Sequence, residues 1–206
     1  MLLHIESLSC RRGERLLFRG LDLTLAAGEA VQVAGANGRG KTTLLRTVCG
    51  LQRPETGAVH WRGRDIRRDP DAFAGNCLYL AHENALNPDL TARENLAALT
   101  RVMGDRSDAA AIDRALADMG ADAWADLPCR SLSAGQRRRS ALARLRLSRA
   151  PLWLLDEPAA ALDTDARGLL ADCIGDHVGA GGTVLFTTHE PLTLPGIGLR
   201  IVELPA

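Results

Sequence analysis

The sequence lacks a net charge and a long apolar run, and each absence excludes a class of protein. Lys plus Arg and Asp plus Glu both count 25, so no global field draws the chain to nucleic acid or acidic lipid. The longest apolar stretches, at residues 152–155 and 184–186, are far shorter than the roughly 18–20 residues that a helix needs to cross a bilayer. We therefore do not expect the chain to form a channel by itself.

The cysteines lack a regular spacing, and the first residues lack the pattern of a signal peptide. The five cysteines are odd in number, scattered and never arranged as Cys-x-x-Cys, which argues against a disulfide framework and a zinc site. We expect reduced, buried thiols. Residues 1–6 have no basic start, long apolar core or small-residue cleavage site. The absence of this pattern predicts a cytosolic chain. We interpret the whole chain, residues 1–206, as one domain.

Short apolar runs predict an α/β fold. Leu21, Leu23 and Leu25 alternate with polar residues, as in a half-buried strand, and they indicate an N-terminal β layer. Later runs are nearly continuous in apolar residues, which suits strands of a mostly parallel sheet with flanking helices; these runs are residues 30–34, 152–155 and 183–186. Ligands of open α/β sheets bind at the carboxyl ends of such strands.

A helical insertion is expected between the strands. From residue 84 to residue 130 the sequence becomes rich in alanine and charge with helical spacing, and residues 91–94 form a capping box that favours a helix start. We interpret residues 84–148, as an approximate range, as a helical subdomain inserted within the single domain.

A phosphate-binding loop is the strongest local signal. The pattern Gly-x-x-x-x-Gly-Lys-[Ser/Thr] follows a buried strand and precedes a helical run. Glycines let backbone N–H groups crowd around phosphate oxygens, and the helix N-terminus adds its dipole. Lys41 is predicted to reach the β- and γ-phosphates of ATP, and the Thr42 hydroxyl to bind Mg²⁺. The expected nucleotide-binding residues of this loop are Gly35, Ala36, Asn37, Gly38, Arg39, Gly40, Lys41, Thr42 and Thr43.

Two carboxylates stand at the end of the apolar run 152–155. Asp156 and Glu157 would be costly there without a cation. Asp156 suits Mg²⁺ through water, and Glu157 is placed to polarise the water that attacks the γ-phosphate. The alternative is that this pair caps the next helix, beyond Pro158.

A third segment resembles the signature of one family of phosphate-loop proteins. Residues 132–136 read Leu-Ser-Ala-Gly-Gln and resemble the Leu-Ser-Gly-Gly-Gln signature of ABC transporter ATPases, with Ala134 at the first glycine. Residues 133–136 also form a capping box, so an ordinary capped helix is the alternative. Other ABC segments follow in order: Ala161-Leu162-Asp163 and Thr188-His189.

The resemblance implies a P-loop NTPase core and a homodimer in the ATP-bound state. In the family, the signature of one subunit closes over ATP on the phosphate loop of the other, which implies such a role for Ser133, Gly135 and Gln136. It also implies that His189 contacts the γ-phosphate, so that it joins the catalytic set with Lys41 and Glu157, and that Asp163 links the halves. Many relatives carry Gln where this chain has Glu83. Glu83, Thr42 and Asp156 are therefore the expected Mg²⁺ ligands.

Within the family, the chain is most similar to the ATPases of cytochrome c maturation. The similarity rests on its short length and on residues 50–54, 59–63, 78–83, 90–96 and 132–139. It implies a peripheral protein on the cytoplasmic side of the bacterial inner membrane, coupled to an integral membrane permease subunit. ATP hydrolysis would then serve haem export or haem handling for c-type cytochrome biogenesis. Another small ABC exporter is the alternative.

Two features leave further alternatives open. A cluster of arginines suggests a nucleic-acid-associated ABC protein. A helix lined with solvated or ion-paired arginines is the simpler interpretation, so we expect no nucleic-acid partner. The cluster consists of Arg137, Arg138, Arg139, Arg144, Arg146 and Arg149. No aromatic residue stands where many relatives stack adenine, and Arg12 is a candidate substitute. A non-hydrolysing nucleotide binder is disfavoured because Lys41 and Glu157 are both present.

Overall fold

The N-terminal part of the chain forms an antiparallel sheet. The computed structural model describes residues 2–102, 108–189 and 192–205. Its first sheet has the order β2-β1-β4-β5, and its strands are β1 (Leu3–Arg12), β2 (Arg15–Leu25), β4 (Thr56–Trp61) and β5 (Arg64–Asp65). Leu21, Leu23 and Leu25 of β2 are buried, because alternate residues of a strand point to the same face. The predicted N-terminal β layer is confirmed.

The second sheet is parallel and carries the expected site at its carboxyl edge. Its order is β6-β7-β8-β3-β9, with β3 (Ala30–Ala34), β6 (Cys77–Leu80), β7 (Leu152–Asp156), β8 (Thr183–Thr187) and β9 (Leu199–Glu203). The three predicted apolar runs are the central strands β3, β7 and β8, and every residue of β7 and β8 is buried. The α/β prediction, with a parallel sheet, is therefore correct.

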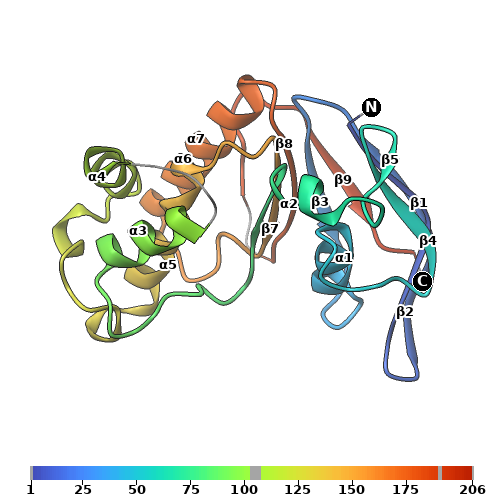
Figure 1. Cartoon of the computed structure of the whole chain (residues 1–206), viewed down its shortest axis with the longest axis horizontal. Coiled ribbons are helices and arrows are strands. Elements are labelled where there is room, and N and C mark those ends of the chain that lie inside the picture. Colours follow the sequence, from blue (N-terminus) through green and yellow to red (C-terminus); the bar gives the residue numbers. More distant parts are fainter. Residues whose placement is uncertain (1, 103–107, 190–191, 206) are drawn as a thin grey trace.

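The parallel sheet separates two hydrophobic cores. Along β7, Leu152 and Leu154 pack into the core shared with the antiparallel sheet and α1 (Lys41–Val48), whereas Trp153 and Leu155 pack into the core shared with the helices. This alternation follows from the pleat of the strand. Figure 1 shows the antiparallel sheet and α1 on one side of β7 and the helices α3 to α6 on the other.

Most of the helices lie between β6 and β7 in the sequence. They are α3 (Ala92–Val102), α4 (Ala109–Asp118), α5 (Ala134–Leu142) and α6 (Arg144–Leu147), with two short 3₁₀ turns; α2 (Pro70–Ala74) precedes β6, and α7 (Thr164–Gly179) follows β7. The predicted capping box of α3 forms: Thr91 N–H donates to Glu94 over 2.9 Å, and Glu94 N–H donates to the Thr91 hydroxyl over 3.1 Å.

Among the described helices, none combines the length and the apolar character that a membrane crossing requires. All five cysteines are free thiols; Cys10, Cys129 and Cys173 are buried as expected, whereas Cys49 and Cys77 are only partly buried.

Candidate nucleotide-binding and hydrolysis site

The phosphate loop lies between β3 and α1. Residues 35–39 are exposed, and Gly40 has a φ of 104° at the N-cap of α1. A Cβ atom at Gly40 would lie 3.0 Å from Cβ of Leu17, so this position requires glycine on two grounds. No side chain caps α1, and no acidic residue lies in its first turn. Its positive dipole end and its backbone N–H groups therefore face the exposed loop, as an anion site requires.

Lys41 brings a positive charge into this loop. Its side chain is buried, and Nζ donates to the carbonyl oxygen of Gly35 over 2.7 Å and to that of Ala36 over 3.3 Å. The ammonium group is thus held among the atoms that surround a phosphate in such loops. Thr42 and Thr43 follow in the first turn of α1 and are partly buried.

Asp156 is the last residue of β7 and is only 1% exposed. Its Oδ1 accepts a hydrogen bond of 2.8 Å from the hydroxyl of Thr187, whereas Oδ2 is buried with no hydrogen-bond partner among the described residues. An unpaired buried carboxylate oxygen is costly, and oxygen is the donor that Mg²⁺ prefers. The orphaned oxygen therefore fits the predicted magnesium site, in which Mg²⁺ would neutralise phosphate charge.

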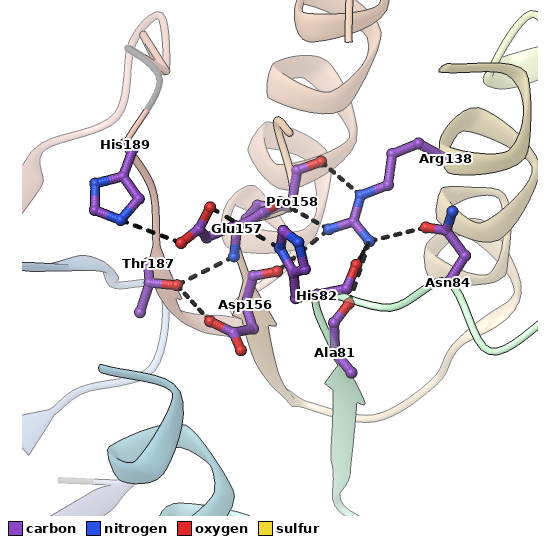
Figure 2. A network of polar contacts seen from close by, with 9 residues as sticks. All are labelled: Ala81, His82, Asn84, Arg138, Asp156, Glu157, Pro158, Thr187 and His189. Atoms are coloured by element: carbon purple, nitrogen blue, oxygen red, sulfur yellow. Dashed lines mark hydrogen bonds and ion pairs between the residues drawn. The ribbon is translucent and has the colours of Figure 1, made fainter. Parts of the chain in front are cut away.

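Glu157 occupies a strained turn beside two histidines. Its φ of 49° lies in the left-handed region, and its N–H donates to the carbonyl and the hydroxyl of Thr187, each over 3.1 Å. Nε2 of His189 lies 3.2 Å from Oε1 of Glu157, and Nδ1 of His82 lies 3.9 Å from Oε2. Figure 2 shows the carboxylate between these two rings. The geometry brings the predicted pair Glu157 and His189 together.

The helix-capping alternative for the acidic pair is wrong. The next helix after β7 is α7, and its N-cap is Asp163, which accepts a hydrogen bond of 2.8 Å from the N–H of Ala166. Asp163 thus has a capping role within the chain, and its link to a second subunit stays a prediction.

The predicted signature segment starts α5, and its N-cap residue Ser133 is exposed. The capping box forms in both directions: Gln136 N–H donates to the Ser133 hydroxyl over 3.2 Å, and Ser133 N–H donates to the Gln136 side chain over 2.8 Å. A Cβ atom at Gly135 would lie 3.0 Å from the carbonyl oxygen of Ala161, whereas Ala134 is exposed. The substitution of the first signature glycine by alanine is therefore sterically tolerated.

Comparison with known proteins decides the family. The family described as ABC transporter matches residues 18–160, which include the phosphate loop, the signature segment and both carboxylates. The chain belongs to the ABC transporter family. The cytochrome c biogenesis ATP-binding export protein CcmA of Methylococcus capsulatus is 46% identical over 93% of this chain and 92% of its own length. Its counterpart in Aromatoleum aromaticum is 47% identical over 100% of this chain and 97% of its own length.

Solved structures of ABC cassettes share the fold. An ABC transporter ATP-binding protein from Pyrococcus furiosus superposes with a TM-score of 0.85 and 25% identity, covering 99% of this chain and 98% of its own. The cassette MJ0796, in a dimeric post-hydrolysis state bound to ADP and Pi, superposes with a TM-score of 0.86 and 24% identity, covering 99% and 94%.

Three residues near the carboxylates were not predicted as part of the ABC site: Thr187, His82 and Arg138. Thr187 binds both Asp156 and the backbone of Glu157, and a hydroxyl at the end of β8 is the signal that could have indicated it. His82 precedes Glu83, and its contact with Glu157 depends on how β6 and β7 pair. Arg138 donates to the carbonyl of Ala81, in the segment that follows β6, and to the carbonyl of Glu157 at the end of β7.

The interpretation of the arginine cluster as solvated or ion-paired is wrong for its two most buried members. Arg138 and Arg144 are 2% and 9% exposed and donate to backbone carbonyls, Arg144 to that of Tyr79 over 2.7 Å. Burial lowers the pKa of each guanidinium to about 10. Arg146 does form ion pairs with acidic residues, and Arg149 is exposed. Since most of the cluster is engaged inside the ABC fold, it does not form a broad basic face.

Glu83 is exposed in the segment that follows β6. As a Mg²⁺ ligand it would contribute favourable charge, so we expect Glu83→Gln to shift the magnesium dependence of turnover to higher concentration, by about threefold to tenfold. If Glu83 instead faces the γ-phosphate, the same change removes repulsion and speeds turnover. Turnover of both forms measured against Mg²⁺ concentration separates the two outcomes. Identical curves for both forms would show a solvated bystander.

Proposed function

We propose that the chain is the ATP-hydrolysing subunit of an ABC transporter complex that couples hydrolysis to a membrane partner in haem handling for c-type cytochrome biogenesis. The observation that carries this proposal is the identity of 46–47% with cytochrome c biogenesis ATP-binding export proteins over nearly the whole chain. The partner would be the integral membrane permease subunit of that system. The chain would then lie peripherally on the cytoplasmic side of the bacterial inner membrane.

The described geometry supports hydrolysis by this chain. Lys41 at the phosphate loop would bind the β- and γ-phosphates, and Asp156, with Thr42 and Glu83, would hold Mg²⁺. Glu157 would accept the proton of the water that attacks the γ-phosphorus, because a carboxylate at a strand end can act as a general base. His189, 3.2 Å from Glu157, would orient the carboxylate and contact the γ-phosphate.

A homodimer in the ATP-bound state is supported by where the two predicted anion sites lie. The phosphate loop begins α1, and the signature segment begins α5, and these helices pack against opposite faces of the parallel sheet. Two chains arranged head to tail would place Ser133, Gly135 and Gln136 of one chain over the ATP of the other. The exposed N-terminus of α5, where the positive end of the helix dipole lies, supports this role.

Deletion and complementation test the proposal. A bacterium that lacks its own cytochrome c maturation ATPase should regain c-type cytochrome when it expresses this chain, and it should not regain it with Lys41→Ala. The measurement is covalently attached haem per cell. If the expressed chain hydrolyses ATP but restores no attached haem, the chain belongs to another small ABC exporter.

We expect weak discrimination between ATP and GTP. Arg12, at the exposed end of β1, can stack on either purine but reads neither base, because stacking supplies affinity more than identity. Competition binding with the two nucleotides tests this. A preference for ATP above about a hundredfold, which corresponds to roughly 2.7 kcal/mol, would reveal an adenine-reading group.

A further inference from the structure

Arg138 is the most deeply buried of the described arginines, and its guanidinium group binds six oxygen atoms. The acceptors are the carbonyls of Ala81, His82, Asp156, Glu157 and Pro158 and the side-chain oxygen of Asn84, at 2.7–3.2 Å. Figure 2 shows the guanidinium between the two segments that supply these oxygens. One side chain thus holds two separate parts of the backbone.

Both segments belong to the candidate site. Residues 81–84 follow β6 and include Glu83, and residues 156–158 include both carboxylates at the end of β7. Arg138 itself lies on α5, little more than one helical turn from Ser133 at the N-cap. Its contacts therefore join the helix that begins with the signature segment to two loops of the candidate site.

The strained turn at Glu157 needs such support. A non-glycine residue with φ of 49° costs about 1–3 kcal/mol and persists only where its surroundings determine it. On one side the N–H of Glu157 is bound to Thr187. On the other side the carbonyl of Glu157 accepts the shortest bond of the Arg138 network, at 2.7 Å. Removing either support should let the backbone relax and reorient the carboxylate.

The arginine is suited to this role because it stays charged. Burial lowers its pKa to about 10, with the charges of Asp156 and Glu157 opposing that shift, so the guanidinium is protonated at neutral pH. Hydrogen bonds from a charged donor are about twice as strong as neutral ones. A lysine would keep the charge, but its three N–H donors cannot replace a planar group with five.

We propose that Arg138 is a positioning residue that holds Glu157 in its reactive orientation and fixes it relative to the signature helix α5 and the loop of Glu83. The proposal rests on the proposed ATPase function. Arg138 would act through the backbone on which Glu157 stands, since its guanidinium donates to the carbonyl of Glu157.

The test compares Arg138→Lys with Arg144→Lys, a second buried arginine, which donates to the carbonyl of Tyr79 within β6. We expect kcat of the purified full chain to fall about tenfold or more for Arg138→Lys with KM for ATP within about threefold, because misplacing a catalytic group slows chemistry more than binding. Arg144→Lys should keep kcat within about twofold. In a Glu157→Gln background, Arg138→Lys should still form the ATP-dependent dimer.

Several results would overturn the proposal. These are a folded Arg138→Lys variant with unchanged kcat, an equal loss in Arg144→Lys, and loss of the ATP-dependent dimer. If Arg138→Lys does not fold, Asn84→Ala decides, since it removes one acceptor at a partly buried position. Its kcat should fall about threefold, and an unchanged kcat would refute the role. Wild-type hydrolysis no faster than that of Lys41→Ala would instead count against the proposed function.

Discussion

Glu157→Gln is expected to bind ATP with near wild-type affinity and to reduce hydrolysis by about 10²–10⁴-fold. The amide keeps the size of the side chain and can still hydrogen-bond water, but it cannot accept the proton that the attacking water must lose. The backbone contacts with Thr187 and Arg138 do not involve the carboxylate, so the turn should keep its shape. The loss should therefore appear in kcat and not in KM.

The same variant tests the dimer. Because hydrolysis is blocked, ATP should stay bound, and size-exclusion chromatography with ATP should show a stable dimer that disappears with ADP. Glu55→Gln is the matched control, since Glu55 is exposed, pairs with Arg11 and lies outside the site, and it should behave as wild type. A Glu157→Gln chain that binds ATP and remains strictly monomeric would contradict the head-to-tail arrangement.

The parts of the site that were predictable are those set by local sequence. The phosphate loop, the carboxylates at the end of β7 and the capping boxes of α3 and α5 each depend on residues within a few positions of one another. Backbone N–H groups, a helix end and a strand end are determined at that range. Sequence patterns therefore indicated Lys41, Asp156 and Glu157.

The contacts of Arg138 and His82 could not be predicted in this way. Arg138 stands between two other arginines, of which Arg139 donates to Met119 within the helical part of the chain. Nothing in that run distinguishes the member that is buried, because arginine is usually exposed and its burial depends on carbonyls 54–57 residues away in sequence. The contact of His82 with Glu157 likewise requires the pairing of β6 with β7, which is a tertiary property.

Lys41→Ala is expected to reduce ATP turnover by at least about 10²-fold while the chain stays folded. Lys41 is the only lysine in the sequence, so no other ammonium side chain of this subunit can replace it at the phosphates. The two hydrogen bonds that it makes end on carbonyls of the exposed loop. Their loss should lower the free energy of unfolding by about 1–3 kcal/mol.

Because the side-chain amine is unique, Lys41 can be tested in the wild-type chain as well. An amine-acylating reagent can modify only Lys41 among the side chains, and mass spectrometry of the peptide that contains it measures the extent of reaction. Bound ATP should protect this amine, and the activity that remains should fall in proportion to its acylation, because acylation removes the charge that binds phosphate. Arg53→Ala, which removes an exposed cation beyond the end of α1, should turn over ATP like wild type. Full activity of a chain completely acylated at Lys41, or of Lys41→Ala, would show that the loop does not bind the phosphates of ATP through this residue.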